Sequence, residues 1–292
     1  MLLHLNSTML LHLYSTEYCS PLPDATFQAL LALLPTPLQQ KVLRFRLWQD
    51  QHASLLGKLL LRIALKNAGQ PTDLDRLHYS TENKPFFPDG PVFNLSHSGN
   101  RVLCLLSDRR ALGIDIESLS PIPFEDFQPQ FTKNEWAVIQ SAPTPLNAFY
   151  RFWTAKESIL KADGRGLGIP LQSLDLSKSM TPTLDGVTWS VHELPLFDNY
   201  ACHYAIELQR EPQAGPEPAP FADPRANIRP AGEPQASPEP AAHANIQPAS
   251  RANIRPANEP QPSLEPAAPP TIELHELTPD NWLDLALESR PF

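Results

Sequence analysis

The pattern of hydrophobic and polar residues predicts the same order of elements twice along the chain: a strand, then helices, then further strands. In the first occurrence, residues 9–16 (MLLHLYST) place leucines between polar residues, as expected for a strand with one buried face. Helical spacing follows over 24–34, 36–46 and 50–68, and short strands are expected at 77–80, 91–95 and 101–107. The second occurrence has a strand at 112–118, helices at 132–140 and 146–162, and strands near 187–194 and 200–208. This repetition predicts an α+β fold with two halves that meet near residue 110.

Proline divides the end of the chain from the rest. Sixteen of the 34 prolines fall within residues 211–270, where proline and alanine make up half of the positions. Such a segment lacks the apolar content for a core and cannot sustain a helix or a strand ladder. We therefore expect a disordered insertion at 211–270, either an arm that docks a partner or an inert loop.

The pattern of a folded chain resumes after the insertion. Residues 271–277 (TIELHEL) alternate as a strand does, and 279–287 (PDNWLDLAL) have helical spacing. The domains predicted are thus an N-terminal half over 1–111, a C-terminal half over 112–210, the insertion, and a return of 271–292 to the C-terminal half.

The first sixteen residues contain a near-duplication. MLLHLNST (1–8) and MLLHLYST (9–16) differ at one position. Neither a basic n-region nor an unbroken apolar stretch is present, which argues against a signal peptide. Two readings stay open: residues 1–8 are an extension and Met9 is the start, or Met1 is the start.

Composition excludes several classes of partner. A formal net charge of -9 disfavours nucleic acid and anionic membranes. The three cysteines are far apart and form no CxxC pattern, which argues against a disulfide framework or a zinc site and fits a cytoplasmic protein. No apolar run reaches the length of a membrane span.

Two carboxylates on one strand suggest a cation site. In LGIDIES (112–118), Asp115 and Glu117 share a face, which is unfavourable unless a positive charge lies between them. On the helix that follows, Glu157 and Lys161 are four residues apart. The simplest reading of that pair is a surface ion pair worth about 0.2–0.5 kcal/mol. With the two strand acids, however, Glu157 completes a set of oxygen ligands suited to Mg²⁺, and Lys161 would point at its phosphates.

A second polar motif follows the strand predicted at 91–95. In FNLSHSG (93–99), Ser96 and His97 can bind a phosphate, although His97 also fits an ordinary turn. Gly164, Gly166 and Gly168 come after a helix and not before one, so they indicate a helix end and not a phosphate loop.

Three stretches together resemble one enzyme family. NKPFFPDGPVFNLSHSG (83–99), GIDIE (113–117) and FWTAKESILKADGRGL (152–167) are similar, in order and spacing, to the Sfp-type 4'-phosphopantetheinyl transferases. The resemblance covers about residues 9–210 and resumes at 271. It implies a pseudo-twofold pair of α+β halves with coenzyme A (CoA) in the cleft between them. The activity it implies is Mg-dependent transfer of the phosphopantetheine arm to a serine of an acyl or peptidyl carrier protein, with release of 3',5'-ADP, as in holo-[acyl-carrier-protein] synthases.

The resemblance also assigns roles to residues. It implies that Asp115, Glu117 and Glu157 hold Mg²⁺ and that Glu157 is the base for the carrier serine. Lys161 would steady the pyrophosphate. Contacts with the nucleotide and its phosphates would come from Lys41, Lys84, Pro85, Ser96 and His97.

Two positions depart from the family. Basic residues that the family uses on the 3'-phosphate are replaced by Leu38 and Ala53, which predicts weaker binding of that phosphate unless Lys58 or Arg62 substitutes. The first alternative to the transferase is a homologue that binds CoA or carrier without turnover. The second is another Mg²⁺-dependent phosphate enzyme.

The expected partner is the carrier alone. Carrier domains are usually acidic, so an apolar or basic docking patch is expected within residues 124–140. Two halves in one chain already complete the site, which predicts a monomer. The sequence does not identify the carrier or whether it serves polyketide, nonribosomal-peptide or fatty-acid synthesis.

Overall fold

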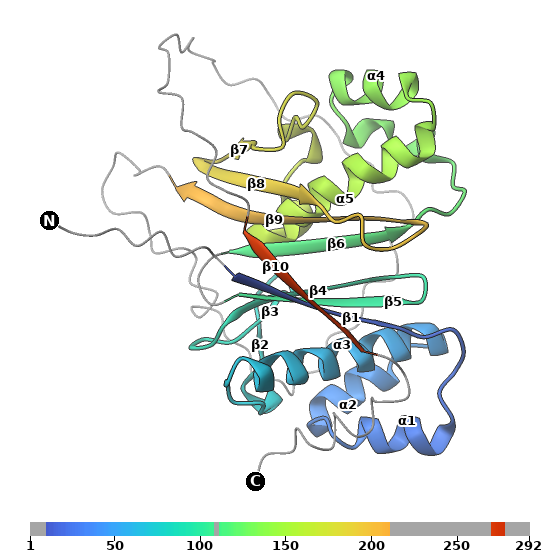
Figure 1. Ribbon diagram of the computed structural model, residues 1–292, viewed down its shortest axis with the longest axis vertical. Coiled ribbons are helices and arrows are strands. Elements are labelled where there is room, and N and C mark those ends of the chain that lie inside the picture. Colours follow the sequence, from blue (N-terminus) through green and yellow to red (C-terminus); the bar gives the residue numbers. More distant parts are fainter. Residues whose placement is uncertain (1–9, 108–110, 211–269, 278–292) are drawn as a thin grey trace, which may run out of the picture.

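The computed structural model describes residues 10–107, 111–210 and 270–277, and it has two four-stranded sheets at its centre with helices outside them (Figure 1). The N-terminal sheet has the order β10-β1-β5-β4. Its strands are β1 (Leu10–Glu17), β4 (Val92–Ser98), β5 (Arg101–Ser107) and β10 (Thr271–Leu277). The C-terminal sheet has the order β6-β9-β8-β7. Its strands are β6 (Leu112–Ser118), β7 (Thr183–Leu184), β8 (Val187–Glu193) and β9 (Tyr200–Arg210).

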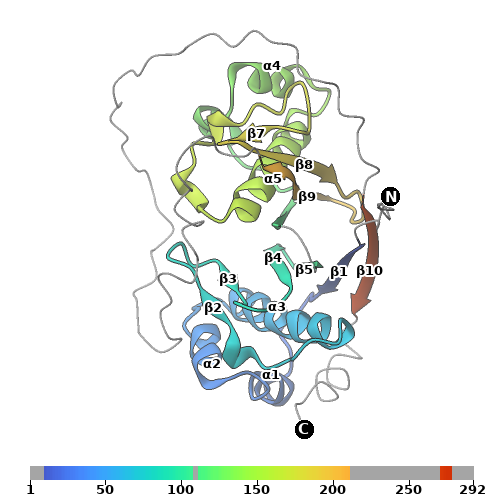
Figure 2. The ribbon, with the colours of Figure 1, turned by 90° about the vertical axis from the view of Figure 1, so that its left-hand side faces the viewer.

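Each sheet carries its own helices. The N-terminal half contributes α1 (Asp24–Leu31), α2 (Thr36–Leu43), α3 (Trp48–Asn67), the 3₁₀ helix η1 (Leu74–Arg76) and a small ribbon of β2 (His78–Tyr79) and β3 (Pro85–Phe86). The C-terminal half contributes α4 (Lys133–Ser141), α5 (Pro145–Asp163) and the 3₁₀ helices η2 (Phe124–Gln130), η3 (Gly166–Gly168) and η4 (Leu171–Ser173). Figure 2 shows the two sets of helices on opposite sides of the paired sheets.

The two halves share one strand arrangement. In each, the first strand pairs antiparallel with a later strand (β1 with β5, β6 with β9), and that strand pairs antiparallel with the one before it in the sequence (β5 with β4, β9 with β8). One long helix, α3 or α5, packs on the sheet of its half. The predicted α+β fold of two similar halves is therefore confirmed.

Strand periodicity explains how both faces of the sheets are buried. On β1, Leu11 and Leu13 face the other sheet, while Tyr14 packs among the helices of its own half. On β6, Ile114 and Ile116 join the same core between the sheets. All five side chains are at most 1% exposed, so the sheets are held together by a continuous apolar layer.

The last strand lies in the other half from the one predicted. β10 pairs in parallel with β1, from Leu10 opposite Thr271 to Thr16 opposite Leu277, so the predicted return of this strand to the C-terminal half is wrong. The alternating pattern specifies a strand but not its partner. The edge of β6 is packed against β4, whereas the edge of β1 that does not face β5 can accept a further strand, and β10 occupies it.

Several predictions lie outside the described residues. These are the extension at 1–8, the insertion over 211–269, and the helical pattern at 279–287. Among the described helices, none combines the length and apolar character of a bilayer span.

Candidate active site at the junction of the two sheets

Side chains of β4 bridge the two sheets by bonding to the backbone of β6. The amides of Ile114, Ile116 and Ser118 donate to Asn94 Oδ1, Ser96 Oγ and Ser98 Oγ at 2.9, 3.2 and 3.1 Å. Because strand side chains alternate, the N-x-S-x-S spacing places all three acceptors on one side of β4. The junction is thus a ladder in which polar side chains replace the backbone carbonyls of a neighbouring strand.

The same serines orient the two strand acids. Ser96 Oγ donates to Asp115 Oδ1 at 3.2 Å, and Ser98 Oγ donates to Glu117 Oε2 at 2.6 Å. Ser96 also accepts from Lys161 Nζ at 2.9 Å, so its one donor and both acceptor positions are used. Ser96 is only 4% exposed and its hydroxyl positions Asp115, while the phosphate contact expected of it stays a prediction.

A glycine brings α5 close to these acids. A Cβ atom on Gly113 would lie 2.1 Å from the carbonyl oxygen of Ser158 and 2.4 Å from the amide nitrogen of Ala162. Only glycine permits this approach of helix to strand. Lys161 thereby reaches the strand, with its Nζ 2.5 Å from Asp115 Oδ1.

The site holds more negative than positive charge. Burial, then the charge of Asp115 and, less, that of Glu117, raise the pKa of Glu157 to about 7, against the lowering effect of Lys161. Burial also raises the pKa of Asp115, although Lys161 opposes it, and the pKa of Glu117. Three carboxylates therefore share one ammonium group, and the cost of ionising the third is high.

The donor set fits a divalent cation. Asp115 is 4% exposed and its Oδ2 is buried with no hydrogen bond, which is costly unless a cation or donor satisfies it. Hard cations prefer carboxylate oxygens. Among the described residues, the three side chains whose possible ligand atoms all lie within 4.8 Å of one another are a different set, His12, Glu273 and His275. In the carboxylate site the ammonium of Lys161 supplies the positive charge beside Asp115.

The remaining predicted residues lie on the N-terminal half. Lys84 Nζ donates to the carbonyl of Ala162 at 2.8 Å, linking the two halves, and burial lowers its pKa to about 8. Pro85 lies on β3, opposite Tyr79 of β2. Lys41 Nζ lies 3.2 Å from the centre of the Tyr79 ring, a cation–π contact.

Basic side chains from the two halves are electrostatically coupled. His97 is exposed, yet the protein around it and the charges of Lys161 and Lys58 lower its pKa. Burial and the charge of Lys41 lower the pKa of Lys58 to about 8. The three side chains Lys41, Lys58 and Lys161, here called the cationic row, thus run from the N-terminal helices to the carboxylate site, and the lowered pKa of His97 beside them favours its neutral form.

Sequence reasoning missed the residues that hold this arrangement together. Asn94 and Ser98 were given no role, although the alternation of polar residues along an otherwise apolar strand was a usable signal. Lys156 lies next to Glu157 but is fully buried, 2.6 Å from the buried Glu135 of α4. Nothing in the local sequence indicates that pair.

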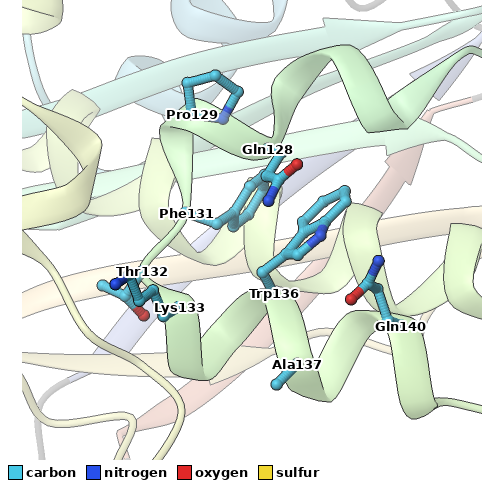
Figure 3. Close-up of a pocket in the computed structure, with 8 residues that line it drawn as sticks. All are labelled: Gln128, Pro129, Phe131, Thr132, Lys133, Trp136, Ala137 and Gln140. Carbon is cyan, nitrogen blue, oxygen red and sulfur yellow. The ribbon is translucent and has the colours of Figure 1, made fainter.

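A separate pocket lies on the surface of η2 and α4, within the stretch predicted to dock a carrier. Figure 3 shows the rings of Phe131 and Trp136 side by side in it. Its volume is about 360 Å³, and its other lining residues are Gln128, Pro129, Thr132, Lys133, Ala137 and Gln140. Both side chains are mainly core, at 5% and 6% exposed, so little of either ring is open to solvent in the pocket.

Comparison with known proteins agrees with the two halves and the site. A family model described as "4'-phosphopantetheinyl transferase, N-terminal" matches residues 20–108, and one described as "4'-phosphopantetheinyl transferase superfamily" matches 111–205. The chain is 32% identical to the 4'-phosphopantetheinyl transferase Sfp of Bacillus subtilis over 170 residues, which cover 56% of this chain and 75% of that protein.

Two further relatives show the same extent of similarity. The 4'-phosphopantetheinyl transferase gsp of Aneurinibacillus migulanus is 33% identical over 56% of this chain and 72% of its own. The 4'-phosphopantetheinyl transferase HetI of a Nostoc species is 30% identical over 63% and 83%. These similarities support the catalytic reading over the binding-protein alternative, and the chain belongs to the 4'-phosphopantetheinyl transferase superfamily.

Proposed function

We propose that the junction of β4, β6 and α5 is the centre at which this chain transfers the phosphopantetheine arm of CoA to a carrier-protein serine, releasing 3',5'-ADP. The transfer and its use of CoA follow from the family. The assignment of residues, the need for Mg²⁺ and the holo-[acyl-carrier-protein] synthase type are our proposals. The observation that carries them is the unsatisfied Oδ2 of Asp115 beside two further carboxylates.

Asp115, Glu117 and Glu157 would hold Mg²⁺. Bound there, the ion would neutralise the CoA pyrophosphate and the charge that develops on its leaving group. The repulsion that raises the pKa of Glu157 is the same energy that a divalent cation would relieve.

Glu157 is suited to accept the proton of the carrier serine. Without a cation, burial and the neighbouring acids raise the pKa of Glu157 to about 7, and a bound cation would lower it, so that the carboxylate would be ionised at neutral pH and able to accept the proton directly or through a water. As the proton moves to Glu157, the serine oxygen forms a bond to the phosphorus that bears the pantetheine, and the bond from that phosphorus to 3',5'-ADP breaks. Lys161, fixed beside Asp115, would stabilise the charge on the departing phosphate oxygen.

Intact-mass spectrometry of apo carrier proteins tests this assignment. With CoA and Mg²⁺, the wild-type chain should add one phosphopantetheine arm, and Glu157→Ala or EDTA should abolish the addition, whereas exposed Glu125→Ala should not. CoA binding without addition, for every carrier, would instead favour the binding-protein alternative. Acyl and peptidyl carriers assayed side by side would show which class is served.

The cationic row supports a proposal for how the 3'-phosphate would be bound. Leu38 and Ala53, which replace the basic residues of the family, are 2% and 3% exposed and belong to the N-terminal core. Arg62 is buried and donates to the carbonyl of Leu33 at 2.7 Å. Lys58, coupled to Lys41, is therefore the residue we propose to compensate.

Lys58→Ala should raise the KM for CoA about tenfold, because one charge-assisted contact to the 3'-phosphate is lost. The KM for dephospho-CoA, which lacks that phosphate, should change little. Steady-state kinetics with both substrates make the measurement, and an equal rise for both would show that Lys58 acts elsewhere. Lys66→Ala, at the end of the same helix, is the matched control.

The pocket of η2 and α4 is our proposed docking surface for the carrier. Lys133 at its mouth would attract an acidic carrier, and the neighbouring Val138 is 44% exposed. We propose a monomer as the active form, since one chain supplies every residue of the site.

A further inference from the structure

Two histidines and one glutamate meet on the edge of the N-terminal sheet, away from the carboxylate site. His12 of β1 lies opposite Glu273 of β10, and Tyr14 lies opposite His275. Because side chains alternate along a strand, all four lie on one face of the sheet. The possible ligand atoms of His12, Glu273 and His275 all fall within 4.8 Å of one another.

The distances between these atoms suit a small metal ion. His12 Nδ1 lies 3.1 Å and His275 Nε2 lies 3.8 Å from Glu273 Oε2. Ligands held at bonds of about 2.0 Å around tetrahedral zinc are separated by roughly 3.3 Å. The His275 ring is held in place by stacking on Tyr14, with ring centres 4.4 Å apart and planes 11° apart.

Both nitrogen atoms lack a hydrogen-bond partner. His12 Nδ1 and His275 Nε2 are removed from solvent and make no hydrogen bond. Each lies near Glu273 Oε2, but neither contact has the geometry of a hydrogen bond. Buried imidazole nitrogens without partners are costly, and a shared metal ion would satisfy both. Imidazole ligands favour zinc, copper, nickel or iron over Mg²⁺ or Ca²⁺.

We propose that His12, Glu273 and His275 form a binding site for Zn²⁺ or a similar transition-metal ion, distinct from the Mg²⁺ site. Three protein ligands leave one coordination position for water. The site uses no cysteine, so the absence of a CxxC pattern did not exclude it. None of the residues proposed for CoA or catalysis takes part.

The ion would fasten β10 to β1. β10 is an edge strand that follows a long segment outside the described residues, and Thr271, Glu273, Leu274 and Glu276 are exposed along it. Its apolar anchoring comes mainly from Leu277 and Ile272. A metal bound across the pair would add its binding free energy to that of the strand ladder.

Isothermal titration calorimetry tests the site. The full chain, freed of metal with a chelator, is titrated with Zn²⁺ in a buffer that contains Mg²⁺ and a reductant. We expect one ion per chain, and at least tenfold weaker binding for His12→Ala and for His275→Ala, with Glu273→Gln as a milder third variant. His192→Ala, in the C-terminal half, is the control and should bind as the wild type does. Equal binding by all variants, or no binding at 0.1 mM Zn²⁺ (about a hundred times a micromolar Kd), would overturn the proposal.

A second readout separates binding from misfolding. Saturating Zn²⁺ should raise the Tm of the wild type by about 5 °C. It should also slow amide exchange in β10 selectively. The same protection in His275→Ala, or protection spread over the whole chain, would contradict a site at this edge.

Discussion

Lys156→Ala should lower the free energy of unfolding by about 3–5 kcal/mol. Lys156 and Glu135 are both 0% exposed and their charged atoms are 2.6 Å apart. Lys156 also donates to the carbonyls of Leu171 and Gln130, so its loss leaves a buried carboxylate without its counter-charge and carbonyls without a donor. Urea denaturation at pH 7 measures the change.

The cost should come from the uncompensated charge and not from lost volume. Glu135 also accepts from the amides of Thr132 and Leu176, which glutamine can retain in part. In the background of Lys156→Met, Glu135→Gln should therefore recover stability instead of reducing it further. Lys133→Ala is the control: this exposed lysine lies on α4 with Glu135, and its loss should change the free energy of unfolding by no more than about 0.5 kcal/mol. Additive losses in the double variant would show that the pair does not act as a unit.

Local spacing was enough to predict most of the elements. The apolar positions over 50–68 correspond to α3, which runs over Trp48–Asn67, and LGIDIES corresponds to the whole of β6. Such patterns work because a helix or strand that buries one face repeats with its own period. They do not specify partners, which is why β10 was expected in the wrong half.

The site was predictable only where one element supplied both residues. Asp115 and Glu117 share a face because strand side chains alternate, and the structure directs both toward serines of β4. The approach of α5 depends instead on Gly113 and on contacts across the fold. The cluster of His12 with Glu273 joins residues from opposite ends of the chain, and no local pattern connects them.

These cases differ in how the free energy is distributed. The buried pair of Lys156 and Glu135 is neutral overall and fully hydrogen-bonded, so it serves the fold. The carboxylate site keeps an excess of negative charge and an unsatisfied oxygen. Groups whose ionisation is unfavourable in the folded chain mark the place where function takes precedence over stability.

Glu157→Gln should stabilise the protein in EDTA by roughly 2 kcal/mol at pH 8 and by little at pH 5. The folded pKa of Glu157 is raised by burial and the neighbouring acids from 4.5 to about 7. Between these values the folded state holds the proton more tightly than the unfolded state, so its contribution to stability falls as pH rises. Glutamine cannot ionise and removes that loss. Thermal denaturation from pH 5 to 8 measures it.

Mg²⁺ should stabilise the wild type more than it stabilises Glu157→Gln. A cation bound by Asp115, Glu117 and Glu157 needs all three ionised, so Mg²⁺ should raise the Tm of the wild type at pH 8 more than that of Glu157→Gln. Glu125→Gln, an exposed carboxylate on η2, should follow the wild type at every pH. If Glu157→Gln were no more stable than the wild type in EDTA at pH 8, the carboxylates would not repel one another in the folded chain. The energetic argument for a cation between them would then fail.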